Sequence, residues 1–360
     1  MDKKYMKLAL ELAKKGCGSV SPNPLVGAVI VKDNRIIGEG YHEIYGGNHA
    51  EVNAFTNSSE SVDGATIYVT LEPCSHYGKT PPCVDKIIEK NISKVVIGTL
   101  DPNPIVSGCG MKKLRDAGIN VEVGVLEEEC IRINEIFMKY IVKKTPFVVM
   151  KIAMSLDGKI ATSSGESKWI SGEDSRRRVH ELRGELSAIM VGVNTIIKDD
   201  AELTSRIEGS KNPIRIVVDS TLRIPIESRI IKSINKSRLI IATTNKATVE
   251  RINILEEKGA EVLILKDKNG RVDLQELMIN LGELQIDSIL LEGGSILNYS
   301  ALESSIVDKV QIYIAPKIIG GEQAKTPVSG EGVTLLKDAF KVRDLKTRFI
   351  GEDIFIEGYI

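Results

Sequence analysis

One group of residues near the start of the chain has the types and spacing of a catalytic zinc site. It consists of His49, Glu51, Cys74 preceded by Pro73, and Cys83. Catalytic zinc takes three protein ligands and leaves its fourth tetrahedral position to water. One imidazole and two thiolates fit that count, and zinc lowers the pKa of its water so that hydroxide forms at neutral pH. The pattern therefore predicts metal-dependent hydrolysis, with His49, Cys74 and Cys83 as the ligands.

Glu51 is predicted to move protons rather than to bind the metal. A carboxylate there can take a proton from the attacking water and deliver it to a ring nitrogen and to leaving ammonia. Within a helix, residues 49 and 51 would point about 200° apart. Both can face one metal if a helix begins here and points at it end-on, and the preceding Gly46–Asn48 segment favours such a start. Cys83 is expected at another helix N-terminus, where the thiolate is favoured.

The spacing of the cysteines leaves other interpretations open. Base deaminases carry H-x-E followed by P-C-x-x-C, whereas eight residues separate Cys74 from Cys83 here. The two cysteines could instead be buried apolar residues. The site could also be a closed structural zinc with His76 as its fourth ligand. The remaining cysteines lack such a context and are interpreted as packing residues: Cys17, Cys109 and Cys130.

Composition and charge narrow the class of protein. The chain has 360 residues and a net charge of −1, so two domains are expected and nucleic acid is disfavoured as the main partner. Residues 1–16 are charged and helix-periodic, so we expect no secretory leader, and no apolar run is long enough to span a bilayer. We therefore expect a cytoplasmic protein, in which neighbouring cysteines bind metal rather than form a disulfide.

Hydrophobic periodicity predicts two α/β domains that meet at Lys143–Pro146. The expected domains are residues 1–144 and 146–360. In the first domain we expect strands at 26–32, 36–40, 66–71, 94–98 and 121–125. Helices are expected at 4–15, from about 49, and at 82–90, 108–117 and 127–141.

The second domain has its own alternation of strands and helices. Its expected strands are 147–153, 187–193, 214–219, 238–243, 261–265, 286–291, 308–314 and 353–357. Its expected helices are 173–184, 247–257, 272–282 and 295–303. This pattern predicts a second, separate sheet covered by helices.

Four segments, in the same order, resemble one known family. The segment Val69–Cys83, including the insertion between its cysteines, closely resembles the deaminase domain of the bifunctional riboflavin-biosynthesis deaminase/reductase. Asn23–Val29, Asp101–Pro104 and Lys151–Lys159 match the same family. The resemblance covers essentially the whole chain. It implies a cytidine-deaminase-like three-layer α/β domain followed by an α/β domain similar to dihydrofolate reductase.

The resemblance also implies two reactions on small phosphorylated pyrimidines. The first is the zinc-dependent hydrolytic deamination of 2,5-diamino-6-(5-phosphoribosylamino)pyrimidin-4(3H)-one. The second is the NADPH-dependent reduction of the ribosyl side chain of 5-amino-6-(5-phosphoribosylamino)uracil to ribityl. Zn²⁺ and NADPH are the implied cofactors, no membrane partner is expected, and a homo-oligomer, either a dimer or a tetramer, is expected because the reductase family tends to dimerise.

Two other functions compete with this interpretation. One is a nucleotide or tRNA-base deaminase that carries an unrelated C-terminal domain, although the near-neutral charge and the long Cys74–Cys83 spacing count against tRNA. The other is a structural zinc module joined to a nucleotide-binding sensor. In such a module no proton shuttle is needed, so replacing Glu51 would leave every activity unchanged.

By resemblance, a set of polar residues surrounds the deaminase substrate: Asn23, His42, His76, Lys79 and Asn103. Amide and cationic donors suit a phosphorylated, hydrogen-bonding substrate. Each residue also has a plainer explanation. The two asparagines precede prolines in turns, where Asn is favoured anyway, and His42 could be a satisfied histidine at a strand end. Within the family pattern, the functional interpretation is favoured for His42, Lys79 and Asn103.

In the second domain, Leu290–Ser295 reads as a strand that runs into glycines and then a helix. Such a turn can present backbone N–H groups to phosphate, although a simple tight turn is the more common explanation. The resemblance places a set of residues along NADPH: Ala153, Trp169, Thr195, Asp199, Ser220, Gly293, Gly294 and Ser295. It places another set at the reductase substrate: Ser167, Arg183, Leu203, Arg206 and Glu292.

Lys151, Asp199 and Glu292 are the polar groups expected around the reacting sugar. A nearby acid helps to populate the ring-opened imine that can accept a hydride. An arginine fork suits phosphate, but Arg183 lies in a charge-rich stretch and could belong to a solvated helix face. Trp169, the single tryptophan, would by default pack in a core.

Overall fold

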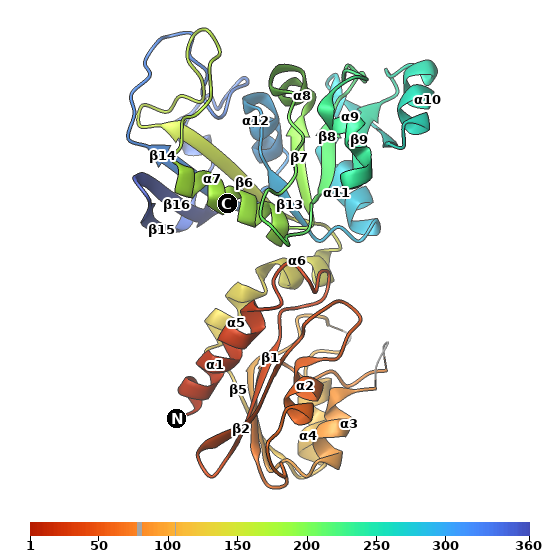
Figure 1. Ribbon diagram of the computed structural model, residues 1–360, viewed down its shortest axis with the longest axis vertical. Helices are drawn as coiled ribbons and strands as arrows, with labels where there is room; N and C mark the ends of the chain where they lie inside the picture. Colours follow the sequence, from red (N-terminus) through yellow and green to blue (C-terminus); the bar gives the residue numbers. More distant parts are fainter. Residues whose placement is uncertain (78–80, 105) are drawn as a thin grey trace. The chain divides into compact units, whose positions relative to one another are not determined.

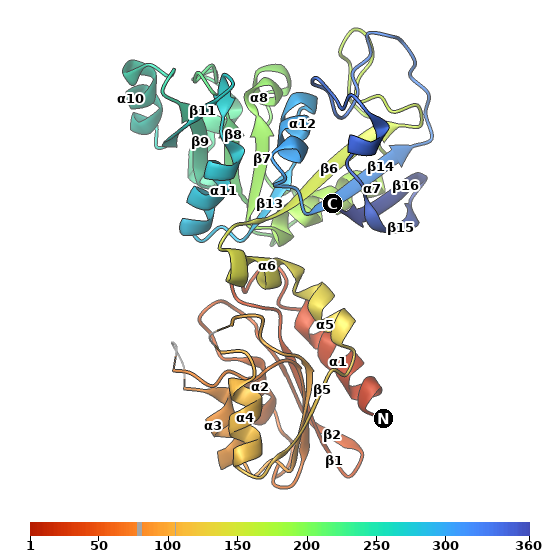
Figure 2. The same cartoon turned by 180° about the vertical axis from the view of Figure 1, so that it is seen from behind.

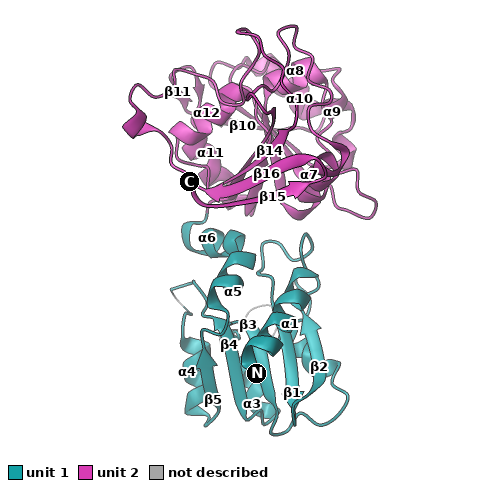
Figure 3. Ribbon diagram, turned by 90° about the vertical axis from the view of Figure 1, so that its left-hand side faces the viewer, with its two compact units in different colours: residues 1–144 teal, residues 145–360 magenta. Residues whose placement is uncertain are grey.

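The chain folds into two compact units, residues 1–144 and residues 145–360 (Figure 3). The structure is a computed structural model that describes residues 1–77, 81–104 and 106–360. Among these residues, no helix has both the length and the apolar character needed to cross a membrane. Each unit has its own sheet and its own hydrophobic core, as the two series of strands in the sequence indicate.

Unit 1 is built on a five-stranded sheet in the order β2-β1-β3-β4-β5 (Figure 3). Strand β1 runs antiparallel to its neighbours β2 and β3, whereas β3, β4 and β5 are parallel. The strands are β1 (Gly27–Lys32), β2 (Arg35–Tyr41), β3 (Thr66–Leu71), β4 (Lys94–Thr99) and β5 (Asn120–Val123).

Helices cover both faces of this sheet. α1 (Asp2–Lys14) and α5 (Glu127–Ile133) cover one face, and α2 (Ala50–Thr56), α3 (Cys83–Glu89) and α4 (Cys109–Asp116) cover the other (Figure 1). Side chains alternate along each strand, so Ile30 packs with α2 and α3 while Val29 packs with α1. The predicted three-layer α/β arrangement is confirmed.

The helix expected at 127–141 is interrupted at Asn134, where α5 ends and α6 (Glu135–Lys143) begins. The Asn134 side chain is buried and holds a distant loop, because its Oδ1 accepts from Leu25 N at 2.8 Å and its Nδ2 donates to Leu25 O at 2.9 Å. This contact joins residues 109 positions apart, so periodicity within the helix could not reveal it.

Unit 2 contains a nine-stranded sheet in the order β10-β9-β8-β7-β13-β6-β14-β16-β15. The strands from β10 to β14 in this order are parallel, and β16 and β15 are antiparallel additions at one edge. The bounds are β6 (Phe147–Ser155), β7 (Ala188–Gly192), β8 (Ile214–Val218), β9 (Leu239–Thr244), β10 (Glu261–Leu265), β13 (Ser288–Leu291), β14 (Lys309–Ala315), β15 (Arg343–Ile350) and β16 (Asp353–Tyr359).

Helices again pack on both faces of the sheet (Figures 1 and 2). α11 (Leu274–Glu283) and α12 (Ser295–Glu303) form one core with the strands, and α8 (Val193–Asp199), α9 (Arg229–Lys232) and α10 (Val249–Glu257) form the other. α7 (Glu173–Glu185) packs Val179 against Tyr313 and Phe355. A short hairpin, β11 (Asp267–Lys268) and β12 (Arg271–Val272), precedes α11.

The sequence prediction missed strand β15 and the short helices α8 and α9. Strand β15 is solvent-exposed at all but its last residue, so it lacks the alternation of buried and exposed residues that marks a half-buried strand. Its partner β16 has buried residues, and for that reason was predicted.

Candidate active sites

Three side chains from separate elements of unit 1 converge. His49 Nδ1 lies 3.5 Å from Cys74 Sγ and 3.3 Å from Cys83 Sγ, and the three candidate ligand atoms lie within 4.8 Å of one another. A tetrahedral zinc with ordinary Zn–S and Zn–N bonds separates its ligand atoms by about 3.5 Å. The donor set and its spacing therefore fit a zinc ion.

Helix starts position the ligands. His49 is the residue before α2 and has an extended backbone, so Glu51 falls in the first helical turn. Cys83 begins α3 and donates its backbone N–H to Cys74 Sγ at 3.3 Å. As expected from the glycines before it, α2 begins at this point, which lets His49 and Glu51 face the same space. Burial, with Glu51 only 3% exposed, raises the pKa of its carboxyl.

The cluster opens on a cavity of about 330 Å³ that His49, Glu51 and Cys74 help to line. Among the described residues, no fourth His, Cys, Asp or Glu joins the three ligands. His76 lines the cavity but is exposed and lies outside the cluster. The described residues thus present the open coordination position of a catalytic site rather than a closed structural zinc.

The predicted substrate residues Asn23, His42, His76 and Asn103 all line this cavity, and Lys79 lies outside the described residues. His42 is buried, and both of its ring nitrogens have partners in the protein. Nδ1 lies 2.9 Å from Asn48 O, and Nε2 lies 3.1 Å from Asn23 Nδ2. Burial lowers the pKa of His42. A neutral imidazole that donates to Asn48 O and accepts from Asn23 would orient the Asn23 amide.

Glu72 is a residue that the sequence reasoning missed. Its buried carboxylate accepts backbone hydrogen bonds from Asp101 N at 3.2 Å, Gly108 N at 2.9 Å and Met111 N at 3.0 Å. These bonds hold the loop between β4 and α4, which carries Asn103 into the cavity. An acidic residue next to the Pro-Cys pair was the available signal, but its partners lie up to 39 positions away.

Unit 2 contains two adjoining cavities at the carboxyl ends of its parallel strands. The larger has a volume of about 980 Å³ and the smaller about 330 Å³. Ligands of open parallel sheets bind at this edge. Six residues line both cavities: Ile160, Ser167, Asp199, Glu292, Gly294 and Ser295.

The cavities separate the predicted reductase residues into groups. Thr195 and Ser220 line only the larger cavity. The predicted residues that line only the smaller one are Lys151, Ala153, Trp169, Arg183 and Gly293. Two predicted substrate residues line neither: Leu203 is buried in the core beneath α8, and Arg206 is exposed.

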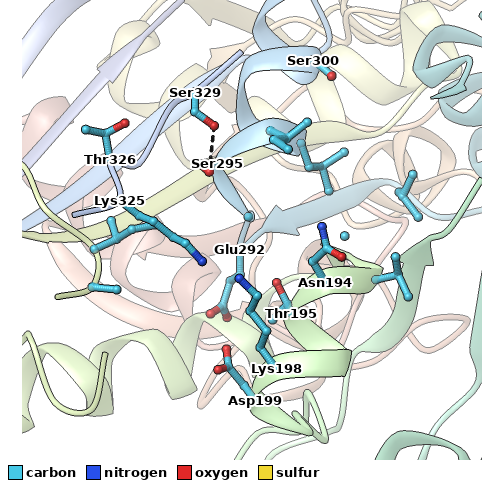
Figure 4. A pocket seen from close by; sticks show the side chains of 18 of the residues that line it. Asn194, Thr195, Lys198, Asp199, Glu292, Ser295, Ser300, Lys325, Thr326 and Ser329 are labelled. Atoms are coloured by element: carbon cyan, nitrogen blue, oxygen red, sulfur yellow. Dashed lines mark hydrogen bonds between the residues drawn. The ribbon is translucent and has the colours of Figure 1, made fainter. Parts of the chain in front are cut away.

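The turn from β13 to α12 places Glu292 and Gly294 at both cavities and Gly293 at the smaller one. Gly293 has φ +73°, and an added Cβ would lie 3.1 Å from the Asn298 amide nitrogen, so a side chain here is disfavoured. At Gly294 an added Cβ would meet nothing within 4 Å, which leaves room for a ligand at the start of α12. Ser295 Oγ lies 2.9 Å from Ser329 Oγ (Figure 4). Open space, a helix N-terminus and the cavity volume fit a dinucleotide cofactor.

Glu292 is held by two cations. Arg183 Nε and Nη2 donate to its carboxylate at 2.7 and 3.0 Å, and Lys151 Nζ lies 3.5 Å away. Burial opposes ionisation of this carboxyl, but the two cations outweigh it and lower its pKa to about 2. The Arg183 side chain is only 15% exposed, so the alternative of a solvated helix face is wrong. The Arg183 guanidinium binds Glu292 through Nε and Nη2, and its Nη1 donates to Thr204 O at 3.0 Å.

Unit by unit, this geometry fits a two-domain enzyme with a metal-dependent hydrolytic centre in one unit and a site for a dinucleotide cofactor in the other. Comparison with known families agrees for each unit. Residues 1–99 match the cytidine and deoxycytidylate deaminase zinc-binding region. Residues 146–356 match the RibD C-terminal domain.

The chain belongs to the RibD family of riboflavin biosynthesis proteins. It is 53% identical to the riboflavin biosynthesis protein RibD of Actinobacillus pleuropneumoniae over 99% of this chain and 94% of that relative. It also resembles the solved structure of Acinetobacter baumannii RibD, with TM-score 0.88 and 35% identity over 99% of this chain and 98% of that one. The deaminase/reductase structure from Thermotoga maritima has TM-score 0.88 and 40% identity over the same shares.

These findings confirm the predicted fold class, a cytidine-deaminase-like domain followed by a dihydrofolate-reductase-like domain. They also confirm the predicted function, a bifunctional deaminase and reductase of riboflavin biosynthesis. The predicted use of Zn²⁺ and NADPH agrees with both family matches and with the two site geometries.

Replacing Glu72 by Gln should impair substrate binding in the deaminase. An amide keeps one acceptor oxygen and turns its NH₂ group toward backbone donors, so the loop that carries Asn103 loses part of its anchor. We expect KM for the diaminopyrimidine to rise about tenfold, with kcat changed much less, zinc content retained and the reductase unaffected. Steady-state ammonia release and metal analysis test this. An unchanged KM would show that Glu72 does not position the loop.

Replacing Arg183 by Met should change how the stability of unit 2 depends on pH. The pKa of Glu292 lies below its ordinary value of 4.5 when folded. Its ion pair therefore stabilises the fold above about pH 4.5 and is lost as the pH falls toward 2. Without Arg183, we expect the free energy of unfolding at pH 7 to fall by about 3 kcal/mol, and its further decline in acid to be smaller.

Urea unfolding of the full chain, followed by the fluorescence of the single tryptophan, Trp169, measures this effect. Arg177→Met is the matched control, because Arg177 lies on the same helix with 75% of its side chain exposed. Equal losses in the two variants would contradict a special role for the Arg183–Glu292 pair.

Proposed function

We propose that residues 1–144 remove the 2-amino group of 2,5-diamino-6-(5-phosphoribosylamino)pyrimidin-4(3H)-one. We further propose that residues 146–360 reduce the ribosyl side chain of the resulting uracil to ribityl with NADPH. The convergence of His49, Cys74 and Cys83 beside buried Glu51 supports the first assignment. The two adjoining cavities that share Glu292 and Asp199 support the second.

In the deaminase, the chain's own groups handle protons and orientation. Zinc, when bound, makes a water molecule acidic enough to attack the ring at neutral pH. Glu51, buried beside the three residues that would hold the zinc, is placed to take a proton from the attacking water and would pass it to the ring nitrogen and then to the leaving ammonia. The Asn23 amide, oriented by His42, and the loop held by Glu72 place polar groups around the pyrimidine.

In the reductase, Arg183 and Lys151 keep the Glu292 carboxyl ionised, and this decides which group can donate a proton. NADPH, when bound, would supply the hydride for the imine carbon of the ring-opened ribosylamine, and the imine nitrogen would need one proton. Glu292 stays ionised above about pH 2, so it cannot supply that proton at neutral pH. Lys151 lies 3.5 Å from Glu292 in the smaller cavity and is the cation placed to donate it. Glu292 then orients Lys151, and Asp199 lies where the two cavities meet.

Replacing Glu51 by Gln should abolish ammonia release while leaving the reductase active. The amide cannot shuttle protons, and loss of a general acid–base residue costs about 10²–10⁴-fold in rate. We expect one zinc per chain to remain, and supplied 5-amino-6-(5-phosphoribosylamino)uracil to be reduced at the rate of the unaltered protein. Separate assays of the two half-reactions, with metal analysis, measure this.

Removing the metal with a chelator is the paired control. It should abolish deamination, and added Zn²⁺ should restore it, with NADPH oxidation unchanged throughout. Ammonia release that survives in the Gln variant would contradict the role of Glu51 as proton shuttle. Absence of NADPH turnover on the deaminated substrate would contradict the reaction proposed for residues 146–360.

We also propose that the chain forms a homo-oligomer through the edge of the unit 2 sheet. Strand β15 lies at the end of the sheet and is almost fully exposed. Leu345 is 60% and Phe349 74% exposed on it, and an exposed apolar edge strand is a surface that another chain can pair with. A cytoplasmic location and the absence of nucleic-acid and membrane partners stay predictions from the sequence.

Phe349→Asp should shift the protein toward the monomer, because a carboxylate at this edge opposes its burial between chains. Light scattering after size exclusion measures the mass. The control is Val249→Asp, which changes another apolar residue of unit 2 that is 71% exposed. An unaltered protein that is already monomeric would refute the proposal.

A further inference from the structure

Two long loops of unit 2 contribute walls to its cavities. The first, residues 156–172, joins β6 to α7, and the second, residues 316–342, joins β14 to β15. Strands β6 and β14 are parallel neighbours in the sheet, so the two loops begin side by side (Figures 1 and 2). Ser167 of the first loop lines both cavities, and Lys325 of the second lines the larger one. The position of these loops therefore decides the shape of the site.

The first loop carries Ser167 and Trp169 near its end. Trp169 lines the smaller cavity, yet its side chain is 60% exposed, so the default role of a tryptophan packed in a core does not apply to it. Its ring lies beside the guanidinium of Arg176, whose Cζ is 4.7 Å from the ring centroid. Because no core holds this stretch of chain, its position depends on a few polar contacts.

Lys317 closes the first loop on itself. Its backbone oxygen accepts from Leu156 N at 2.7 Å, and its Nζ donates to Trp169 O at 2.9 Å and to Ile170 O at 2.8 Å. One residue thus joins the start of the loop to a stretch near its end. Lys317 lies directly beyond β14, and its own N–H donates to Ala315 O at 2.7 Å. The ammonium group is therefore anchored to the central sheet.

The stretch 167–170 has few other anchors. The next residue, Ser171, accepts at its backbone oxygen from Arg176 Nη1 at 2.5 Å, so the start of α7 holds the chain from that side. In the part of the chain that the structure describes, no side chain other than that of Lys317 hydrogen-bonds to the backbone of residues 167–170. The placement of Trp169 along the cavity wall therefore depends on one ammonium group.

We propose that Lys317 is a positioning residue of the reductase, which fixes Ser167 and Trp169 at the cavity walls. The inference rests on the proposed reductase function and deepens it. Lys317 lines neither cavity of unit 2, so its effect passes through the backbone that it holds. A stretch that is already ordered before ligands arrive does not subtract its ordering cost from their binding. Lys317 therefore contributes to affinity and leaves the hydride step unchanged.

The fluorescence of Trp169, the single tryptophan of the chain, reports on this contact directly. Lys317→Met keeps the length of the side chain and removes its donors, so we expect stronger quenching by acrylamide and lower anisotropy than in the unaltered protein. Lys317→Arg should preserve both values, because a guanidinium can also donate to two carbonyl oxygens. The matched control is Lys258→Met, since Lys258 is exposed and lines none of the three cavities.

Steady-state kinetics of the full chain separate positioning from chemistry. For Lys317→Met, we expect KM for 5-amino-6-(5-phosphoribosylamino)uracil and for NADPH to rise about tenfold, with kcat changed by less than about threefold. Lys317→Arg and Lys258→Met should retain the kinetics of the unaltered protein. Urea unfolding followed by circular dichroism should give the same midpoint for all three variants, because these lysines are exposed.

Four outcomes would overturn the proposal. Unchanged quenching, anisotropy and KM in Lys317→Met would show that the stretch keeps its place without the ammonium group. Equal losses in Lys317→Met and Lys317→Arg would show that donation to the two carbonyl oxygens is not the cause. A lost kcat with unchanged KM would assign Lys317 to the hydride step. A higher KM together with a lower urea midpoint would assign it to the stability of the fold.

Failure of this proposal is distinguishable from failure of the reductase function. Quenching and anisotropy are measured without substrate or cofactor, so they test Lys317 even if the unaltered protein oxidises no NADPH with the deaminated substrate. That second result would refute the function alone. If turnover is observed and Lys317→Met behaves like the unaltered protein in every measurement, only the positioning role is wrong.

Discussion

The carboxyl ends of parallel strands lie at the same edge of a sheet, so the residues that follow those strands lie close together. Both sites depend on this constraint. In unit 1, Cys74 follows β3 and the loop of Asn103 follows β4. In unit 2, Glu292 follows β13 and Ser220 follows β8. Because the sheets hold these ends side by side, residues far apart in the chain line common cavities. The helices on each face bury the strands and keep those ends in register.

In both sites, buried carboxylates that are bonded to backbone N–H groups or to cations hold the surrounding segments in place. Glu72 accepts from the backbone N–H groups of Asp101 and Gly108 in one loop and of Met111 in the helix that follows it. Glu292 binds Arg183 and Lys151. Burying a charge costs several kcal/mol per ion unless it is paired. These contacts therefore specify one arrangement of the loops rather than many. Glu51 differs, because its burial beside the metal ligands raises its pKa and equips it to carry a proton.

Local sequence predicted much of the fold and part of the sites. The strands with alternating or continuous apolar residues were found, as was the helix start at His49, because both signals lie within a few neighbouring residues. The break at Asn134 and the exposed strand β15 were not found. The break at Asn134 depends on Leu25, which is 109 positions away. Strand β15 was missed because it is exposed at all but its last residue, although its partner β16 follows it directly in the chain.

The sequence by itself determined the chemistry that the chain can perform. A histidine, a glutamate and two cysteines, in that order along the chain, predict a zinc-dependent hydrolytic site, and the resemblance of four segments indicates the deaminase/reductase family. Only the tertiary structure decided that Arg183 pairs with Glu292 rather than lying on a solvated helix face, and that Glu72 anchors the loop that carries Asn103. It also decided that two cavities of unit 2 adjoin and share Asp199 and Glu292. Side-chain types limit which reactions are possible, whereas partners and distances depend on long-range packing that no local pattern encodes.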